Sequence, residues 1–209
     1  MRQDYTRHQL LESEVAGDPF AQFHGWFDEA RRHGIREPNA MVLSTVNPAG
    51  GVSSRTVLLK GLDDRGFQFF TNRDSRKGEQ LRAEPRAAVT FLWAELERQV
   101  NIEGTVEWVS EAESDAYFLV RPHSAQIGAW VSLQSQVIPD REWLERRLEE
   151  FQEKYSEPGS VPRPPQWGGY RLVPMRMEFW QGRPSRLHDR LVFMRAGEGE
   201  AWRVERLSP

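Results

Sequence analysis

The stretch from residue 53 to residue 81 reads SSRTVLLKGLDDRGFQFFTNRDSRKGEQL. Residues 55–60 form an apolar run with a cation at each end, and residues 67–71 form an aromatic run. The sequence DDRG between the two runs is typical of a tight turn, so they predict a β-hairpin. Ser75 follows a short polar loop and predicts the N-cap of a helix. The stretch therefore predicts strand, turn, strand and helix in this order.

The helix expected after Ser75 opens with Arg76 and Lys77. The first N–H groups of a helix are unpaired and carry the positive end of its dipole. Two cations beside them favour a phosphate monoester. The same residues are equally consistent with a hairpin and a basic helix start whose charges face solvent. The pattern alone leaves both interpretations open.

The composition is that of a globular protein, because 38% of the 209 residues are hydrophobic and 28% are charged. This length suits a single domain. Eight Trp and eleven Phe are many for such a chain. They would suit an aromatic core, and they would also suit aromatic walls around a flat ligand.

Charge and cysteine content exclude several classes of function. A net charge of −3 with scattered cations offers no basic surface for nucleic acid. The absence of cysteine excludes disulfides, thiolate metal sites and a cysteine nucleophile. The opening MRQD starts no apolar signal region, and no apolar run approaches the length of a membrane span. We therefore expect a cytoplasmic protein that binds neither nucleic acid nor membrane.

Short strands dominate the pattern along the whole chain. Strands are expected at residues 41–46, 55–60, 67–71, 87–93, 99–109, 169–180, 191–195 and 202–207, and helices at residues 18–34, from 75 onward, 110–120, 123–130 and 140–155. Residues 1–17 are polar and weakly patterned, which predicts a mobile N-terminal arm. Strands at these intervals favour antiparallel pairing, so we expect a mainly β fold with peripheral helices, a small barrel in one domain spanning residues 1–209.

Several common catalytic motifs are missing from the sequence. There is no GxGxxG after a strand, no GxxxxGK[ST] and no GxSxG, and the five histidines have no metal-ligand spacing. We therefore expect no metal site. What remains is a set of cations among aromatic residues, which suits a flat anionic ligand. The set consists of Arg55, Lys60, Arg76, Lys77, Arg121, Arg186 and Arg190, with His188 and Trp180.

The run WQGRPSRLHDR at residues 180–190 is the densest part of this set. It places three arginines and a histidine beside the expected end of a strand, where folding alone would not favour so many cations. Asp189 would either orient His188 or offset the charge. Taken singly, each cation of the set is more often a member of a surface ion pair.

Nine blocks of sequence, in order along the chain, resemble those of one known family. The blocks are RTVLLK (55–60), FFTNRDSRK (69–77), LERQV (96–100), YFLVRP (117–122), QIGAWVSLQS (126–135), WGGYRL (167–172), EFWQG (178–182), RLHDR (186–190) and ERLSP (205–209). The family is that of the pyridoxine (pyridoxamine) 5′-phosphate oxidases, flavoproteins with the FMN-binding split β-barrel fold. The resemblance runs from Tyr5 to Pro209.

The resemblance implies FMN as the cofactor, in a homodimer whose flavin sites lie at the interface between subunits. It implies that FMN is bound by Arg55, Thr56, Val57, Leu58, Leu59, Lys60, Phe70, Thr71, Arg76, Lys77, Gln99, Gln134, Ser135, Trp180 and Arg190, with Arg76 and Lys77 at the phosphate. It implies that the substrate is bound by Arg2, Tyr5, Lys60, Tyr117, Arg121, Arg186, Leu187 and His188. Arg186 and His188 are then the catalytic residues beside the reacting carbon.

One departure from the family pattern concerns the substrate phosphate. The pattern RPxxSQ has a serine where this chain has Ala125, in the sequence RPHSAQ of residues 121–126. Ser124 is one residue early and would point elsewhere on a helix. This departure bears on how tightly the substrate phosphate is held and leaves the flavin residues unaffected.

The function that the resemblance implies is oxidation of pyridoxamine or pyridoxine 5′-phosphate to pyridoxal 5′-phosphate. A hydride would pass from the 4′ carbon to the flavin, and O₂ would be reduced to H₂O₂. A related oxidase of the same barrel that acts on a phenazine precursor is the nearest alternative. A protein that only stores or delivers flavin or pyridoxal phosphate is a second one. Lys60, Tyr117 and Arg121 favour a phosphorylated substrate, and Arg186 with His188 favour catalysis.

Overall fold

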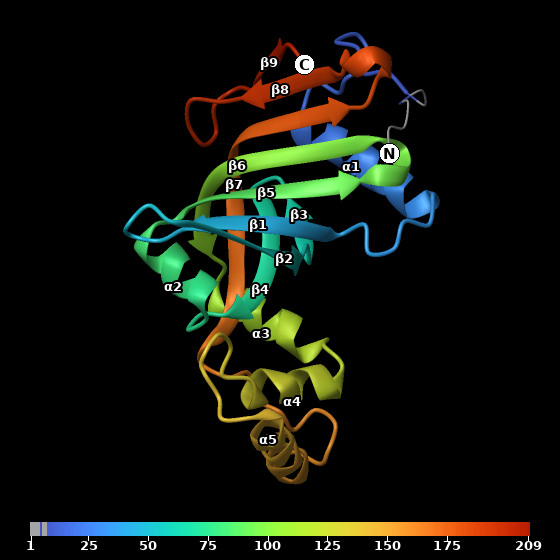
Figure 1. Ribbon diagram of the computed structural model, residues 1–209. Helices are drawn as coiled ribbons and strands as arrows, with labels where there is room; N and C mark the ends of the chain where they lie inside the picture. The colour runs from blue at the N-terminus through green and yellow to red at the C-terminus, as the bar shows by residue number, and fades with distance from the viewer. Residues whose placement is uncertain (1–4, 6–7) are drawn as a thin grey trace.

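One antiparallel sheet forms the centre of the molecule in the computed structural model, which describes residue 5 and residues 8–209 (Figure 1). Its strands are β1 (Ala40–Val46), β2 (Val52–Leu58), β3 (Gly61–Asp63), β4 (Gly66–Asn72), β5 (Arg86–Trp93), β6 (Arg98–Trp108), β7 (Trp167–Gln181), β8 (Asp189–Met194) and β9 (Arg203–Arg206). The helices are α1 (Pro19–Arg32), α2 (Arg76–Ala83), α3 (Glu111–Leu119), α4 (His123–Val131) and α5 (Arg141–Lys154). The predicted mainly β fold with peripheral helices is confirmed.

The long strand β7 divides the sheet into two parts. Its neighbour on one side is β6 along nearly its whole length, whereas the other side pairs first with β4 and then with β8. The register with β6 shifts between Glu103 and Gly104, opposite Pro174. A Cβ on Gly104 would overlap the carbonyl oxygen of Val173, so this close approach requires glycine. Figure 1 shows β7 curving at this place, and the sheet curls into a half-barrel.

Helix α1 covers the main apolar core. Asp18 caps it by accepting a hydrogen bond from the Ala21 backbone N–H, and Pro19 occupies the first turn. Phe23 is fully buried, with its ring centroid 4.9 Å from that of Phe67 and 5.0 Å from that of Phe91. Edge-to-face ring contacts of this kind stabilise a core beyond the area they bury. The surplus of phenylalanine is therefore explained largely by packing.

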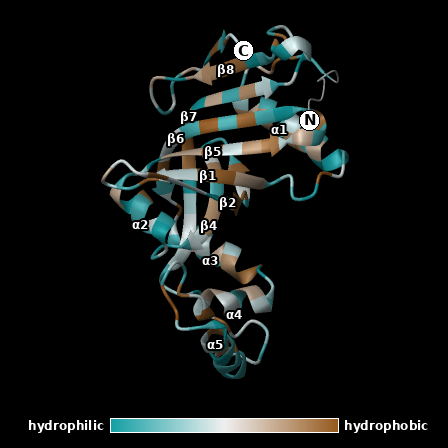
Figure 2. Cartoon of the chain, in the orientation of Figure 1, coloured by the Kyte–Doolittle hydropathy of each residue, from teal (hydrophilic) through white to brown (hydrophobic). Residues whose placement is uncertain are grey.

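Three helices gather at the opposite end of the molecule around a second, smaller apolar cluster. Ser110 and Glu113 form a reciprocal capping box at the start of α3, which was expected over residues 110–120. Phe118, Ile127, Val131, Val161 and Trp167 make up the buried part of the cluster. Helix α5 has no buried residue and is mostly hydrophilic in Figure 2.

The first strand of the predicted hairpin ends earlier than expected. It was predicted over residues 55–60 and paired with residues 67–71, but β2 ends at Leu58 and pairs with β1. The strand that pairs with β4 across the DDRG turn is the short β3 instead, so this part of the hairpin prediction was wrong. The backbone N–H of Leu59 donates to Asn39 and that of Lys60 donates to Gln68, so the chain leaves β1 and turns toward β4. This turn separates Lys60 from the β2 ladder and directs it to a different part of the site.

The described part of the N-terminal segment is attached to the end of the sheet. The Leu10 backbone N–H donates to Asp189 Oδ2 at 3.1 Å, and the Leu10 side chain is buried. Arg206 on β9 forms an ion pair with Glu12 at 2.6 Å and another with Asp189 at 2.8 Å. Arg2, which the sequence placed in the substrate site, lies outside the described residues, and the mobility of the arm stays a prediction.

Candidate active site

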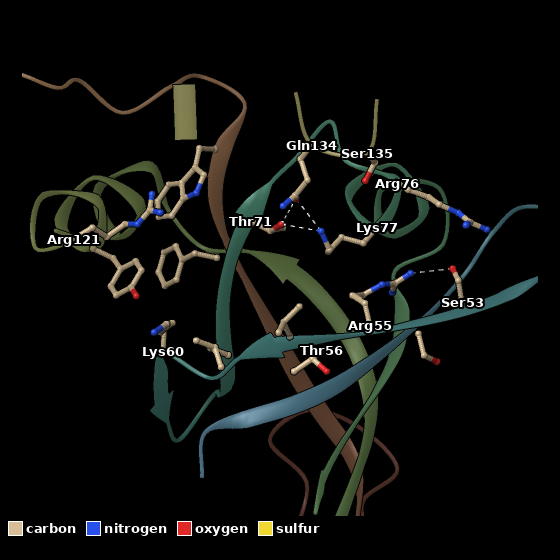
Figure 3. A pocket seen from close by; sticks show the side chains of 16 residues that line it. Ser53, Arg55, Thr56, Lys60, Thr71, Arg76, Lys77, Arg121, Gln134 and Ser135 are labelled. Atoms are coloured by element: carbon tan, nitrogen blue, oxygen red, sulfur yellow. Dashed lines mark hydrogen bonds between the residues drawn. The ribbon is translucent and has the colours of Figure 1, made fainter. Parts of the chain in front are cut away.

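A cavity of about 580 Å³ lies where β2, β4, the start of α2 and the helical end of the molecule meet (Figure 3). It is lined by Ser53, Ser54, Arg55, Thr56, Val57, Leu58, Lys60, Phe70, Thr71, Arg76, Lys77, Tyr117, Arg121, Gln134, Ser135 and Trp167. Most of the residues predicted to bind FMN are therefore brought together in one place. Leu59 does not line the cavity, because its side chain belongs to the main core.

The charged residues that line the cavity are all positive. Five of its lining residues are cations and none is acidic. Burial lowers the pKa of Lys77 to about 8, and the nearby charge of Arg55 adds to this effect. Burial also lowers the pKa of Arg55, with a further contribution from Arg76. Cations that repel one another without an internal counter-ion favour binding of an anion.

The start of α2 supplies the most specific part of this anion site. Ser75 is buried and caps the helix, and its hydroxyl accepts from the Gly78 backbone N–H at 3.4 Å. Arg76 and Lys77 are the first two helical residues, as predicted. A Cβ on Gly78 would overlap the backbone of Arg73, so the tight turn into the helix requires glycine here. Unpaired N–H groups and two cations therefore meet at one helix end.

Lys77 is held in place by neutral oxygen atoms. Its Nζ donates to Gln134 Oε1 at 2.9 Å and to Thr71 Oγ1 at 3.2 Å. The Thr71 hydroxyl also donates to Gln134 Oε1 at 2.9 Å. These contacts, drawn in Figure 3, join the loop after α4 to β4 and α2. These neutral acceptors orient the lysine, and none of them is a carboxylate that would compensate its charge.

A wall of aromatic rings closes the other side of the cavity. Phe70 stacks on Tyr117 with ring centroids 4.1 Å apart and on Trp167 at 5.4 Å. The Arg121 guanidinium lies 4.7 Å from the Trp167 ring, and its Nη1 is buried without a hydrogen-bond partner. Burial lowers the pKa of Arg121. A buried donor of this kind requires an acceptor, and an anionic ligand in the cavity would supply it.

The remaining predicted site residues form a second group at the end of β7. Tyr5, Trp180 and His188 contact one another through their rings, with centroids 4.7 Å apart for Trp180 and His188. The His188 Nδ1 accepts from the backbone N–H of Arg183 at 3.1 Å, so the neutral ring carries its proton on Nε2. This bond fixes which nitrogen of His188 presents a proton to a ligand.

The short turn before β8 presents Arg186 and Leu187 to solvent. Ser185 and Arg186 both have left-handed backbone angles, with φ of 58° and 63°. Such angles are costly for residues other than glycine and are concentrated at functional sites. Leu187 is 70% exposed. Neither Arg186 nor Leu187 contributes to the apolar core.

Gln99, Trp180 and Arg190 line a separate cavity of about 440 Å³ on the open face of the sheet. Arg190 forms an ion pair with Glu178, with nitrogen and oxygen 2.8 Å apart. Burial would raise the pKa of Glu178, but hydrogen bonds from Arg190 and Arg176 hold it below its usual value. This arginine is therefore charge-compensated, unlike those of the first cavity.

The two groups of predicted site residues are not joined within one chain. The first cavity and the second share no lining residue. In Figure 1 the second group lies beside β8, at the opposite end of the molecule from α3 and α4. Among the residues that the structure describes, no group of three His, Asp or Glu could hold a metal ion. Within the same residues, no helix is both long and apolar enough to cross a membrane.

Comparison with known proteins places this geometry in a family. Residues 27–155 match the family described as pyridoxamine 5′-phosphate oxidase. Residues 167–209 match the C-terminal dimerisation region of pyridoxine 5′-phosphate oxidase. The chain belongs to the pyridoxine/pyridoxamine 5′-phosphate oxidase family. The resemblance noted in the sequence blocks is thereby confirmed.

Named members of this oxidase family match the whole chain. A pyridoxine/pyridoxamine 5′-phosphate oxidase of Nostoc punctiforme is 57% identical, and that of Cupriavidus necator is 56% identical. Each alignment covers 100% of this chain and 97% of the relative. The oxidase of Rubrobacter xylanophilus is also 56% identical, over 100% of this chain and 95% of its own.

Two solved structures share the oxidase fold. PhzG from Burkholderia lata, in complex with tetrahydrophenazine-1-carboxylic acid, has a TM-score of 0.88 and 33% identity, covering 96% of this chain and 98% of its own. A pyridoxamine 5′-phosphate oxidase-related, FMN-binding protein of Nostoc punctiforme has a TM-score of 0.74 and 18% identity, covering 93% and 100%. The second similarity concerns the fold alone and confirms the expected split barrel.

Sequence reasoning missed several residues that line the first cavity. Ser53, Ser54 and Trp167 line the first cavity but were not predicted to do so. Ser53 could have been found, because it lies two residues before Arg55 and therefore on the same side of β2. Trp167 stood within the WGGYRL block, but nothing in its neighbours indicated a stack with Phe70.

Proposed function

We propose that this protein is an FMN-dependent oxidase that converts pyridoxamine or pyridoxine 5′-phosphate to pyridoxal 5′-phosphate, with O₂ reduced to H₂O₂. With the amine substrate, one water is also consumed and ammonia is released. One observation carries the proposal beyond family membership. The first cavity holds five cations, no acidic lining residue and a buried, unpartnered arginine nitrogen beside stacked aromatic rings. This chemistry fits a flat cofactor and a substrate that both carry phosphate.

The FMN phosphate would bind at the start of α2. Arg76, Lys77 and Arg55 surround this point, and the helix adds its unpaired N–H groups. Backbone and side chains of β2, with Thr71, Gln134 and Ser135, would then follow the flavin from its phosphate toward its ring. The cations repel one another in the empty site, so a dianion would relieve that repulsion.

The substrate phosphate would bind at the other side of the same cavity. Lys60, Tyr117 and Arg121 line this side, and the unpartnered Nη1 of Arg121 would donate to a phosphate oxygen. Ala125 is not among the lining residues. The hydroxyl that the family pattern offers at this position is therefore absent, and water could take its place.

The reacting end of the site would be completed by a second copy of the chain. Arg186, His188, Trp180 and Arg190 lie away from the first cavity within one chain, and residues 167–209 match a dimerisation region. A homodimer in which these residues face the partner's first cavity would bring the two groups together. Each of two equivalent sites would then use both subunits.

The protein's own residues would position the substrate and donate hydrogen bonds beside its reacting carbon. FMN, when bound, supplies the hydride acceptor and the reaction with O₂. The phosphate contacts would fix the substrate ring in place, which turns an encounter in solution into a reaction within one complex. His188, with its proton on Nε2, and Arg186 would donate to polar groups beside the reacting carbon.

The assay that tests this proposal is steady-state release of H₂O₂ by the protein loaded with FMN. Pyridoxamine 5′-phosphate, pyridoxine 5′-phosphate and a reduced phenazine precursor are supplied in parallel. Turnover with either phosphorylated vitamer and none with the phenazine precursor is the expected result. The reverse preference would assign the chain to the activity suggested by its similarity to PhzG. Flavin binding without turnover of any of the three would instead indicate a storage or delivery protein.

Subunit complementation tests the shared site. One variant carries Arg76→Glu and Lys77→Glu, the other carries Arg186→Ala and His188→Ala, and each is expected to be inactive alone. If each site uses both chains, the mixed dimer contains one site with all four residues intact. Complete exchange of equal amounts should then restore about one quarter of the wild-type activity, since half of the dimers are mixed and half of their sites are intact. No recovery after verified exchange would place the whole site within one chain.

A further inference from the structure

Two buried polar side chains that do not line the cavity form a small cluster that contacts Arg55. Thr45 on β1 is fully buried, and Gln80 on α2 is 5% exposed. Gln80 follows Arg76 by four residues, so both lie on the same side of the helix. Neither Thr45 nor Gln80 lines the cavity. Burying an amide and a hydroxyl costs free energy unless both groups are hydrogen-bonded.

The cluster satisfies its hydrogen bonds through Arg55. The Thr45 hydroxyl donates to Gln80 Oε1 at 2.6 Å and accepts from Arg55 Nη1 at 2.6 Å. Ser53 repeats this arrangement, because its hydroxyl donates to Gln80 Oε1 at 2.9 Å and accepts from Arg55 Nη2 at 2.9 Å. Arg55 Nη2 also lies 3.5 Å from Gln80 Oε1, and Nη1 donates to the Leu43 carbonyl at 3.2 Å. Figure 3 draws the Arg55–Ser53 contact.

All of these acceptors are neutral. Other arginines of the protein are held by carboxylates: Arg190 by Glu178, and the buried Arg171 by Glu107 and Glu113 among others. A carboxylate would orient Arg55 equally well, but it would also cancel the charge that the guanidinium directs toward the cavity. Neutral oxygens orient the group and leave its charge uncompensated. The price is a less favourable charged state, which is acceptable only where an anion binds.

We propose that Gln80, acting with Thr45, is a positioning residue of the flavin-phosphate site, which holds Arg55 in place without neutralising it. This inference rests on the proposed binding of FMN in the first cavity. It makes a specific claim about residue type, because a neutral amide is required at position 80 where the closely similar carboxylate of glutamate would fit. A role limited to packing α2 against β1 makes no such distinction.

The decisive variant is Gln80→Glu. Its carboxylate would stand within about 3.5 Å of Arg55 Nη2 and form an ion pair with it. The loss of one charge-assisted contact to phosphate corresponds to roughly tenfold to hundredfold weaker FMN binding. Riboflavin lacks the phosphate, so its affinity should stay unchanged. The melting temperature of the flavin-free protein should not fall, because the new ion pair replaces a neutral contact.

Two further variants separate orientation from charge. Gln80→Met and Thr45→Val remove hydrogen-bond acceptors from the cluster while leaving the charge of Arg55 intact. Both should weaken FMN binding by roughly threefold to tenfold, less than Gln80→Glu, because only the orientation of the guanidinium is lost. Gln152→Glu is the matched control. Gln152 is exposed on α5, so this variant makes the same change in net charge at a distance from the cavity.

The experiment titrates the full-length flavin-free protein with FMN and with riboflavin, following the flavin fluorescence. A loss of affinity for FMN alone in Gln80→Glu, with Gln152→Glu unchanged, supports the inference. If the affinity for FMN is unchanged in Gln80→Glu, or if FMN and riboflavin lose affinity equally, the inference is overturned. If Gln80→Glu fails to fold, unchanged ratios of FMN to riboflavin affinity in both Gln80→Met and Thr45→Val overturn it instead. Wild-type protein that binds FMN no better than riboflavin contradicts the proposed flavin site itself.

Discussion

Burial brings the titration of Lys77 close to neutral pH. Its pKa is about 8 instead of the ordinary 10.5, because burial disfavours the charged form and Arg55 adds repulsion. A phosphate dianion favours the protonated amine, so bound FMN raises this pKa, and FMN affinity must fall as the pH rises through about 8. The protonated fraction of the free protein drops about tenfold between pH 7 and pH 9 for a group with a pKa of about 8, and FMN affinity should drop with it.

The measurement is the dissociation constant of FMN from the full-length protein across that pH interval. The interval lies above the second ionisation of a phosphate monoester, at about pH 6, so the ligand keeps a constant charge. Lys77→Arg should give a flat profile, because its guanidinium stays charged throughout. Riboflavin should also bind with little dependence on pH. An equally flat profile for FMN with the wild-type protein would refute the assignment of Lys77 to the phosphate.

Three other variants have defined outcomes. Ala125→Ser should lower KM for pyridoxamine 5′-phosphate roughly threefold to tenfold with kcat little changed, because it restores a hydroxyl donor, while Ser124→Ala should be silent in the same assay. Arg186→Ala and His188→Ala should each reduce kcat/KM strongly but leave flavin content and melting temperature nearly unchanged; full activity in both would show that their roles are misassigned. Gly78→Ala should destabilise the protein by about 1–3 kcal/mol in denaturant unfolding, because its Cβ would overlap the backbone of the preceding loop; unaltered stability would show that this turn can relax.

Local sequence signals were sufficient for the parts of the site that depend on neighbours in the chain. The N-cap at Ser75 and the two cations after it form the anion site at the start of α2, as expected from the residue types alone. The helix that begins after Ser110 was expected from a similarly local pattern, and a capping box starts it. These features need only a few consecutive residues, so no long-range information is required to predict them.

Other parts of the site depend on contacts between distant residues. Thr45 and Gln80 are 35 positions apart and meet only because α2 packs against β1, and an isolated polar residue in a strand or helix gives no signal of such a partner. Lys60 leaves the β2 strand because its backbone N–H bonds to Gln68, which the apolar run before it did not indicate. His188 is separated from the first cavity because β7 runs between the two places. Sequence motifs alone do not show the course of a strand in space.

Anaerobic mixing of the flavin-loaded protein with pyridoxamine 5′-phosphate tests directly whether the bound flavin oxidises this substrate. We expect the flavin absorbance to bleach as one pyridoxal 5′-phosphate forms per flavin. Admitting O₂ should then restore the colour with release of an equal amount of H₂O₂. Unphosphorylated pyridoxamine at the same concentration should bleach the flavin far more slowly, because it lacks the group that Lys60 and Arg121 would bind. A flavin that stays oxidised with both pyridoxamine 5′-phosphate and pyridoxine 5′-phosphate would contradict the proposed oxidase activity.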